Sequence, residues 1–383
     1  MNSTGSIRYA GVNDCKIDLF EGQYRVPNGM SYNSYVIEDR QCAVLDTADA
    51  HYADEWLSNV ERILNGRNAD YLIVSHMEMD HAAGIVQFME KNPQAKIVAT
   101  AAAFRMMTQF FKTDFSERKI IAADGSTLDL GTHRLTFITA PMVHWPEVMM
   151  TYDAADKTLF SADAFGKFGA LGTEEEWDCE ARRYYFGIVG KYGQQVQSLL
   201  KKVSALDIQN ICPLHGPVLS ENLSHYMQLY SIWSSYQSET DGVFIAYASV
   251  YGNTKKAAQL LARKLEAANV KYEIADLARE DMAECVENAF RYSKLVLASV
   301  TYDSGVFPCM KTFISMIADR NFQNKTVAFI ENGSWAPAAA KTMKQLLEGC
   351  RNISFAQNQV TVKSALNSGS EAAVESLAQE LAG

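Results

Sequence analysis

The sequence lacks the features that mark a membrane, secreted or thiolate-metal protein. Its seven cysteines are scattered among 383 residues and are never spaced C-x-x-C. We therefore expect neither a disulfide framework nor a built-in rubredoxin-type iron site. The first residues show no basic stretch followed by an apolar one, and no run approaches the roughly 18 apolar residues of a membrane helix. These absences predict a cytoplasmic protein with buried free thiols.

Positive charge is also in short supply. With 45 acidic and 35 basic residues, the formal net charge is -10, which opposes binding to phosphate backbones and to anionic lipid. We therefore expect no nucleic acid and no membrane as partner. The sequence contains neither the G-x-G-x-x-G dinucleotide fingerprint nor a Walker loop, which disfavours NAD and ATP. What remains is an ordinary globular composition over a length that favours two or three domains.

The first part of the chain mixes short apolar runs with helical stretches. Runs of β-branched and aromatic residues predict strands, and helical periodicity is found around 82–90 and 102–111. A hairpin turn at 153–156 joins two apolar runs. This order predicts a mixed sheet with covering helices. The strands expected before residue 140 are 35–37, 42–45, 71–74, 97–99 and 135–138.

A change of pattern follows a polar, glycine-containing stretch at 237–242, which is typical of a domain boundary. We predict one domain over residues 1–240 and a second over residues 241–383. In the second domain, strands and helices alternate regularly from a strand at 243–248 to a final helix near 371–381. That alternation predicts a doubly wound parallel sheet.

The densest chemistry lies directly after the predicted strand 71–74. Four potential metal ligands, His76, Glu78, Asp80 and His81, occur within six residues. Residues two apart in an extended strand end point the same way, so His76 and Glu78 can serve one ion. Asp80 and His81, after the chain turns, can then serve a neighbouring ion. Any one of these residues alone would be read as an ordinary polar side chain, but together they indicate a metal site.

Three further candidates, His144, Asp163 and His215, each follow a predicted strand. Ligands at the same end of several strands converge on one cleft, which is where open α/β sheets place their sites. Three carboxylates among seven ligands supply hard oxygen donors and about three negative charges, which favours redox-active iron over zinc without fixing the metal. The remaining histidines, at positions 51, 133 and 225, are interpreted as surface or satisfied polar residues.

The second domain opens with a loop, 249–254, between a strand and a helix. Its hydroxyls and the backbone N–H groups at the helix N-terminus can bind a phosphate monoester without a lysine. Loops at 299–305 and 331–335 follow later strands and carry aromatic side chains that could lie against a bound ring, although loop aromatics are commonly just packing. The predicted cofactor-binding residues are Ser249, Val250, Tyr251, Gly252, Asn253, Thr254, Thr301, Tyr302, Asp303, Ser304, Gly305, Asn332, Gly333, Ser334 and Trp335.

The run H-x-E-x-D-H, together with the later ligands and the segment His144-Trp145-Pro146-Glu147, resembles the flavodiiron subfamily of the metallo-β-lactamase superfamily. The loop 249–254 resembles the flavodoxin phosphate loop. The resemblance implies an N-terminal metallo-β-lactamase-like αββα sandwich and a C-terminal flavodoxin-like domain that binds FMN. It also implies one iron held by His76, Glu78 and His144, a second iron held by Asp80, His81 and His215, and Asp163 bridging the two.

The same resemblance implies reduction of dioxygen to water, or of nitric oxide to nitrous oxide, in a head-to-tail homodimer. Since no C-x-x-C pair is present, we expect the electrons to come from a separate donor, rubredoxin or a reductase. Two alternatives stay open: a metal-dependent hydrolase with a regulatory flavodoxin domain, and a non-enzymatic electron carrier. Glu78 speaks against the first, and the complete ligand set speaks against the second.

Overall fold

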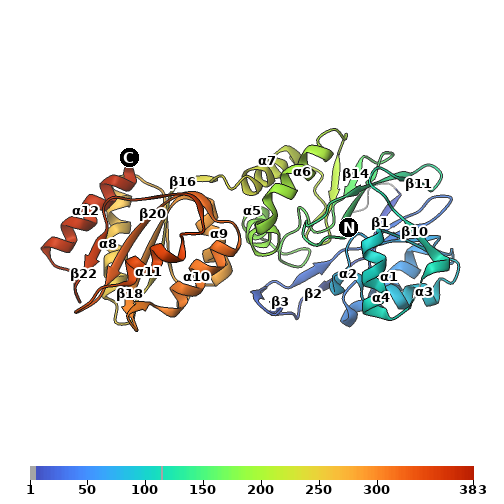
Figure 1. The fold of residues 1–383 in the computed structure, drawn as a ribbon. Helices are drawn as coiled ribbons and strands as arrows, with labels where there is room; N and C mark the ends of the chain where they lie inside the picture. The colour runs from blue at the N-terminus through green and yellow to red at the C-terminus, as the bar shows by residue number, and fades with distance from the viewer. Residues whose placement is uncertain (1–5, 114) are drawn as a thin grey trace. The chain divides into compact units, whose positions relative to one another are not determined.

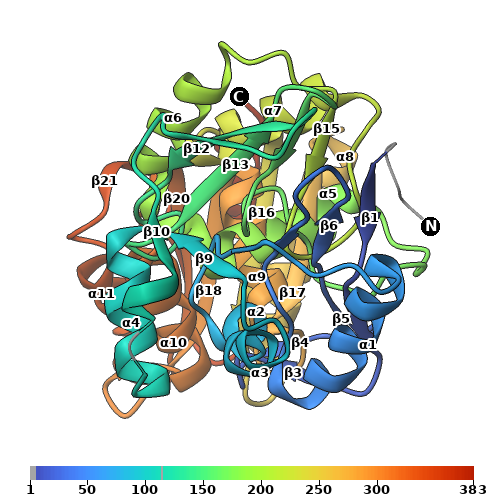
Figure 2. The same cartoon turned by 90° about the vertical axis from the view of Figure 1, so that its right-hand side faces the viewer.

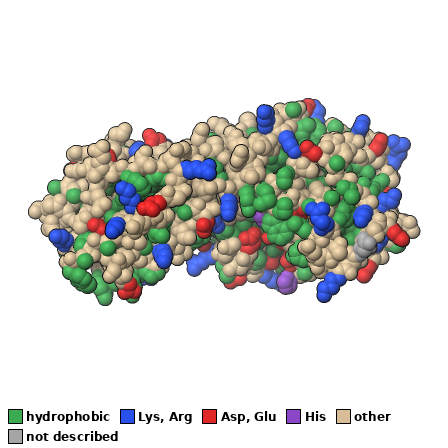
Figure 3. All heavy atoms as spheres, in the orientation of Figure 1, with side chains coloured by type: hydrophobic (Ala, Val, Ile, Leu, Met, Phe, Trp, Pro, Cys, Tyr) green, Lys and Arg blue, Asp and Glu red, His purple; other side chains and the backbone are tan. Residues whose placement is uncertain are grey.

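The computed structural model describes residues 6–113 and 115–383. The chain divides into two compact units, Met1–Ser231 and Ile232–Gly383, each described here by itself. The boundary predicted between residues 240 and 241 lies nine residues after this division, just inside the first strand of the second unit, and stays a prediction. Within the described residues, no helix combines the length and the apolar character needed to cross a membrane. On the face shown in Figure 3, basic and acidic side chains are interspersed.

The first unit contains two main sheets, drawn in blue to green in Figure 1. Two small hairpins accompany them, β2 (Val12–Asp14) with β5 (Met30–Tyr32) and β3 (Leu19–Phe20) with β4 (Tyr24–Arg25). In sheet order, the first main sheet has strands β1 (Ile7–Tyr9), β6 (Tyr35–Ile37), β7 (Ala43–Leu45), β8 (Tyr71–Ile73), β9 (Lys96–Ala99) and β10 (Lys119–Ile121). The second has β11 (Thr127–Asp129), β12 (Arg134–Thr139), β13 (Met149–Asp153), β14 (Thr158–Phe160) and β15 (Asn210–Cys212).

The two sheets share one hydrophobic core. Ile73 and Val98 of the first sheet are buried in the same cluster as Phe137 and Met149 of the second. The ring of Tyr35 lies edge-on to that of Phe160, with centroids 5.4 Å apart. Apolar side chains alternate inward from both sheets, which is the packing of a sandwich. The predicted mixed sheet is therefore two facing sheets, a distinction that short strands do not reveal by their periodicity.

Helices cover both outer faces of this sandwich. Figures 1 and 2 show α1, α3 and α4 gathered on one side of the unit, away from α6 and α7. The helices in chain order are η1 (Ala50–Tyr52), α1 (Ala53–Leu64), α2 (Met79–Ala82), α3 (Ile85–Lys91), α4 (Ala101–Phe111), η2 (Ser116–Arg118), α5 (Trp177–Tyr184), the π-helical turn η3 (Tyr185–Val189), η4 (Gly190–Tyr192), α6 (Gly193–Val203) and α7 (Leu223–Ser234). The order helix, sheet, sheet, helix confirms the αββα expectation.

The continuous helix predicted over 82–90 is wrong at its start, because the chain leaves α2 after Ala82 and begins α3 only after Gly84. A Cβ on Gly84 would lie 2.9 Å from the ring of Trp56, so only glycine fits there. The hydroxyl of Thr47 accepts a hydrogen bond from the Gly84 N–H and donates one to the carbonyl of His81. The break therefore fixes the short helix α2, which carries two of the predicted ligands.

The second unit is the predicted parallel sheet flanked by helices, drawn in yellow to red in Figure 1. Its strand order starts β17 (Tyr272–Asp276), β16 (Thr240–Ala248), β18 (Tyr292–Tyr302) and β20 (Gln323–Asn332), and β20 pairs in parallel with both β21 (Arg351–Phe355) and β22 (Val360–Val362). The order is that of doubly wound flavodoxin-like sheets. The helices are α8 (Asn253–Ala267), α9 (Met282–Arg291), α10 (Pro308–Asp319), α11 (Ala339–Leu346) and α12 (Ser368–Ala382).

The predicted loop around 299–305 needs correction. Strand β18 continues to Tyr302 because its end still pairs with β20, Ser299 opposite Glu331 and Val300 opposite Asn332. A tight turn then leads into β19 (Gly305–Val306), which pairs back on β18. The sequence also gave no sign of β21, since its pattern Arg-Asn-Ile-Ser-Phe lies on an exposed edge and is largely polar.

Candidate metal centre and flavin pocket

Seven side chains meet at one end of the sandwich, where several strands finish. His76 follows β8, and Glu78 precedes α2, which carries Asp80 and His81. The other three, His144, Asp163 and His215, follow β12, β14 and β15. The structure thus brings together all seven residues singled out in the sequence, in two groups of possible metal ligands that are buried or partly buried.

The first group is His76, Glu78, His144 and Asp163. The carboxylate Oε2 of Glu78 lies 3.2 Å from His76 Nε2 and 3.1 Å from His144 Nε2. Asp163 Oδ2 lies 3.3 Å from the same two nitrogens. Two imidazole nitrogens and two carboxylate oxygens therefore point at a common position.

The second group is Asp80, His81 and His215. Asp80 Oδ2 lies 3.2 Å from His81 Nε2 and 3.3 Å from His215 Nε2. The other oxygen of Asp163, Oδ1, lies 3.4 Å and 3.7 Å from the same nitrogens. Each oxygen of Asp163 thus faces one group, which is the geometry of a bridging carboxylate.

The polar atoms of these groups fit a pair of cations better than they fit one another. Both carboxylate oxygens of Asp80 and of Asp163 are buried without a hydrogen-bond partner among the described residues. His81 Nε2 and His215 Nε2 lie 3.1 Å apart, a contact in which only one of the two nitrogens can carry the bridging proton. Buried polar atoms left in this way cost free energy unless a ligand satisfies them. Two divalent cations would satisfy both features.

The electrostatics of the site also favour positive charge. Burial lowers the pKa of His144, but the carboxylates of Asp163 and Glu78 outweigh this and raise that pKa to about 9. Burial raises the pKa of Glu78, but His144 and His76 outweigh this and lower it to about 2. Burial also opposes charge on Asp163, yet the surrounding histidines hold its pKa well below the usual range. The carboxylates therefore stabilise positive charge at the histidine nitrogens, whether it is a proton or a metal ion.

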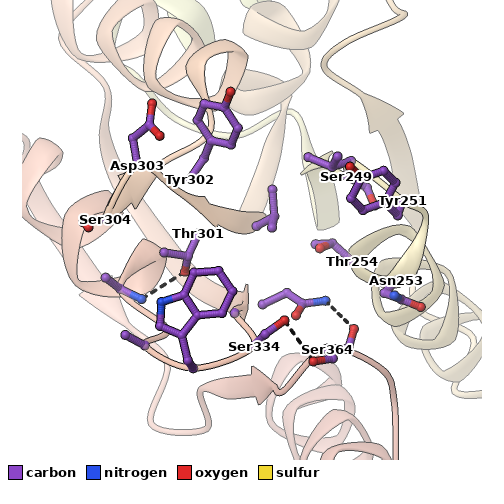
Figure 4. A pocket seen from close by; sticks show the side chains of 17 residues that line it. Ser249, Tyr251, Asn253, Thr254, Thr301, Tyr302, Asp303, Ser304, Ser334 and Ser364 are labelled. Atoms are coloured by element: carbon purple, nitrogen blue, oxygen red, sulfur yellow. Dashed lines mark hydrogen bonds between the residues drawn. The ribbon is translucent and has the colours of Figure 1, made fainter.

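A second candidate site lies at the carboxyl ends of β16, β18 and β20 in the other unit. It is a cavity of about 620 Å³ between the loop after β16 on one side and the ends of β18 and β20 on the other, as Figure 4 shows. Its lining residues are Ser249, Val250, Tyr251, Asn253, Thr254, Val300, Thr301, Tyr302, Asp303, Ser304, Asn332, Gly333, Ser334, Trp335, Ala336, Ala338 and Ser364.

The loop after β16 has the form expected for phosphate binding. Gly252 has a φ of 87°, and α8 begins at the next residue, so the N–H groups of the first helical turn, which have no partner within the helix, follow this loop directly. The hydroxyl of Ser249 accepts a hydrogen bond of 3.1 Å from the Gly252 N–H. The cavity itself is lined by Ser249 and Thr254 and not by Gly252. Gly252 therefore shapes the turn rather than the cavity wall.

Family models match both parts of the chain. One described as ODP family beta lactamase matches residues 30–216, and the flavodoxin model matches residues 245–376. An anaerobic nitric oxide reductase flavorubredoxin of Salmonella arizonae is 28% identical over 90% of this chain and 74% of its own length. The chain belongs to the flavodiiron family. An uncharacterized protein of Methanocaldococcus jannaschii is 29% identical over 91% of this chain and 88% of its own.

Solved structures agree with the flavodiiron fold. A rubredoxin oxygen:oxidoreductase from Desulfovibrio gigas superimposes with a TM-score of 0.92, at 24% identity, over 100% of this chain and 97% of that one. A flavodiiron protein from Giardia intestinalis gives 0.89, at 23% identity, over 98% and 95%. At this identity the likeness concerns the fold, and the ligand roles of individual residues stay a proposal.

The residues around the candidate metal centre include some that the sequence interpretation did not assign. Glu147, cited there only as part of the family's motif, contacts His76 Nδ1 through Oε1 at 2.8 Å. The carbonyl of Ser31 lies 2.7 Å from His215 Nδ1. The ring of Tyr184 is buried with its centroid 5.5 Å from that of His215. The acid three residues after His144 is the one signal for Glu147 in the sequence.

The other histidines lie outside this centre. His133 precedes β12, so it lies at the opposite end of the sandwich from His144, and its Nδ1 is 2.7 Å from buried Asp153. Its Nε2 lies 2.5 Å from the hydroxyl of Ser6, so both ring nitrogens are satisfied. His51 and His225 contact the carboxylates of Asp49 and Asp178. His133 therefore belongs to a closed hydrogen-bond network that ties the start of β1 to the β13–β14 hairpin.

In the flavin pocket, two predicted residues do not line the cavity, Gly252 and Gly305, and four lining residues were not predicted, Val300, Ala336, Ala338 and Ser364. The hydroxyl of Thr301 accepts hydrogen bonds from the N–H groups of Ala338 and Ala339. Thr301 thus caps α11 as well as bordering the cavity. Tyr251 and Trp335 are each 93% exposed, so their rings are free to lie against a ligand.

Proposed function

We propose that this chain is an oxidoreductase that reduces dioxygen to water or nitric oxide to nitrous oxide at a pair of iron ions, with electrons supplied through FMN. The observation that carries the proposal is Asp163, each of whose buried oxygens faces one of two ligand groups. Reduced FMN supplies two electrons and two ferrous ions supply two more, which matches the four electrons that convert dioxygen to water.

The side chains of the centre would divide the work of binding. His76, Glu78 and His144 would hold one ion, and Asp80, His81 and His215 the other, with Asp163 shared. Three carboxylates give the set more oxygen character and negative charge than a zinc hydrolase normally has, which supports iron. Aromatic rings restrict water around the ligands: Trp145 lies edge-on to His76 at 5.1 Å, and Phe20 edge-on to His215 at 5.4 Å, between centroids.

For the flavin, the loop 249–254 would bind the phosphate through hydroxyls and backbone N–H groups, and Tyr251, Tyr302 and Trp335 would flank the ring system. The name of the Desulfovibrio gigas structure pairs rubredoxin with oxygen, which supports rubredoxin as donor, with a nicotinamide-dependent reductase as the other candidate. A head-to-tail homodimer, implied by the resemblance, belongs to the same proposal, and sedimentation of the purified chain tests it.

One experiment tests the function. The purified protein is reduced without air, and dioxygen or nitric oxide is then added while flavin reoxidation, gas consumption and metal content are followed. We expect iron, bound FMN and rapid reoxidation with either or both gases. Zinc occupancy with ester hydrolysis and no gas consumption would instead support a metal-dependent hydrolase. Gas-driven flavin reoxidation that is unchanged in Asp163→Ala would support a simple electron carrier.

A further inference from the structure

Three of the four histidines of the metal centre, His76, His81 and His215, differ in what their Nδ1 contacts. His76 Nδ1 lies 2.8 Å from the carboxylate oxygen Oε1 of Glu147. His215 Nδ1 lies 2.7 Å from the backbone carbonyl of Ser31. His81 Nδ1 is buried and has no hydrogen-bond partner among the described residues. The three imidazoles therefore have a charged acceptor, a neutral acceptor and none.

The carboxylate of Glu147 is held firmly in this role. Its Oε1 also accepts a hydrogen bond of 2.9 Å from the N–H of Met77, the residue after His76. The Thr100 hydroxyl donates to the backbone carbonyl of Glu147 at 2.9 Å, which fixes the loop that carries it. Glu147 is 1% exposed, and its Oε2 has no hydrogen-bond partner among the described residues. Little in its surroundings therefore draws its charge away from His76.

A carboxylate acceptor has a predictable effect on a ligand histidine. It keeps the proton on Nδ1, which leaves the Nε2 lone pair free for the metal, and it makes that nitrogen more basic. A backbone carbonyl also keeps the proton on Nδ1, but it raises the basicity of Nε2 less. The nitrogen donor from His76 is therefore stronger than those from His81 and His215, and the added negative charge favours the higher oxidation state of the metal beside it.

We propose that Glu147 makes the two metal positions unequal, so that the ion at the His76, Glu78 and His144 position is the first to be oxidised and the last to be reduced. Glu147 is thus a positioning and tuning residue for His76. The inference rests on the proposed function, because it assumes that both positions hold iron. Each position has two imidazoles and one carboxylate of its own and shares Asp163, so the outer carboxylate of Glu147 is a charge that only the first position has.

Glu147→Gln tests the proposal, because glutamine keeps the size and an acceptor oxygen but removes the charge. Redox titration followed by electron paramagnetic resonance should show two iron couples in the native protein. In the variant with two irons bound, we expect the couple of lower potential to rise, with the ferric-to-ferrous ratio at a fixed potential falling about tenfold. The higher couple should move much less. Asp153→Asn is the matched control, since it removes a buried carboxylate from His133, which lies outside the centre, and should move neither couple.

Glu147→Ala gives a second measurement that does not depend on redox chemistry. With no acceptor left for His76, titration of the chelator-treated protein with cobalt(II) should show one of two binding steps weakened about 10- to 100-fold and the other retained. Unchanged couples in Glu147→Gln, movement of the higher couple alone, or equal weakening of both cobalt steps would overturn the proposal. A native protein that binds two irons but fails to consume either gas would refute the proposed function and leave the inequality measurable.

Discussion

The two candidate sites of this chain are built from different kinds of groups. In the metal centre, Asp163 and His76 are almost wholly buried, charged groups face one another, and outer residues hold the ligands in place. In the flavin pocket, hydroxyls, backbone groups and small side chains line an open cavity, and Trp335 is 93% exposed. A site built from charged side chains can therefore be recognised from residue types, whereas a site built from backbone groups can be recognised only once the fold is known.

The largest effect should come from Asp163→Asn, which should impair the metal centre and leave the flavin pocket unchanged. The amide cannot offer a negative oxygen to both ligand groups, so the loss in iron affinity should exceed the 10- to 100-fold that is typical of losing an outer partner. Iron per chain should drop below one and gas consumption should be lost, while FMN stays bound because its pocket lies in the other unit. Metal analysis and flavin absorbance measure both quantities on one sample.

Two results would contradict this prediction. If Asp163→Asn keeps two irons, the bridging role is wrong, and if it releases FMN, the two sites are not independent. Asp153→Asn serves as the control here too, because it removes a carboxylate of equal burial from the other end of the same sandwich.

The next largest effect should be a difference in how the affinities of the two sites depend on pH. The pKa of His144 in the protein without metal is raised to about 9, so at pH 7 this ring carries a proton that a metal ion must displace. Iron affinity should therefore rise as the pH rises from 7 toward 9, about tenfold per unit for one displaced proton. The unbound protein should show the reverse: a raised His144 pKa gives stability that is full below about pH 6.5 and is lost through pH 9.

FMN affinity provides the contrast in that experiment. No histidine lines the flavin cavity among the described residues, and the phosphate, whose second pKa is about 6, is already a dianion above pH 7. Fluorescence titration should therefore give nearly constant FMN affinity from pH 7 to 9. A pH-independent iron affinity over the same range would show that the histidines are not protonated before the metal binds.

The same contrast explains how far the sequence could go. The seven candidate ligands could be selected because H-x-E-x-D-H concentrates metal-binding side chains behind an apolar strand and three further candidates follow other strands. Glu147 could not be assigned a partner, since a lone acid has many possible roles and its contact with His76 joins residues 71 positions apart. Contacts between residues far apart in the sequence cannot be predicted from it, even where the candidate ligands themselves can be recognised.

The pocket was predicted less completely for a physical reason. Ser364 lies in the loop after β22, a three-residue strand with no recognisable periodicity, and reaches the cavity by way of hydrogen bonds with Ser334 and Asn332. Thr301 and Tyr302 were placed in a loop, but strand pairing continues through them into the β18–β19 hairpin. Such placements depend on how far neighbouring strands pair, which residue types do not specify.

The next largest effect should come from replacing His133, a histidine outside the metal centre, and it should fall on stability alone. His133→Ala removes the imidazole from buried Asp153 and from the Ser6 hydroxyl, which keeps only its 3.3 Å contact with the carboxylate of Asp156. We expect a loss of about 1–3 kcal/mol in the free energy of unfolding, measured in urea, with iron content and FMN binding unchanged. Loss of iron in folded His133→Ala would mean that this network is coupled to the metal centre at the other end of the sandwich.

The smallest effect should come from Trp335→Ala in the flavin pocket. The indole is 93% exposed, so its loss leaves no hole in the core and should not change the free energy of unfolding measurably. Stacking against an aromatic ring is worth about 0.5–1.5 kcal/mol, so FMN affinity should weaken about 2- to 10-fold by fluorescence titration. Trp335→Phe should recover most of this loss, because it restores a ring but not the indole N–H. Equal weakening in both variants would show that Trp335 acts through its N–H instead, and no weakening would place the flavin ring elsewhere in the cavity.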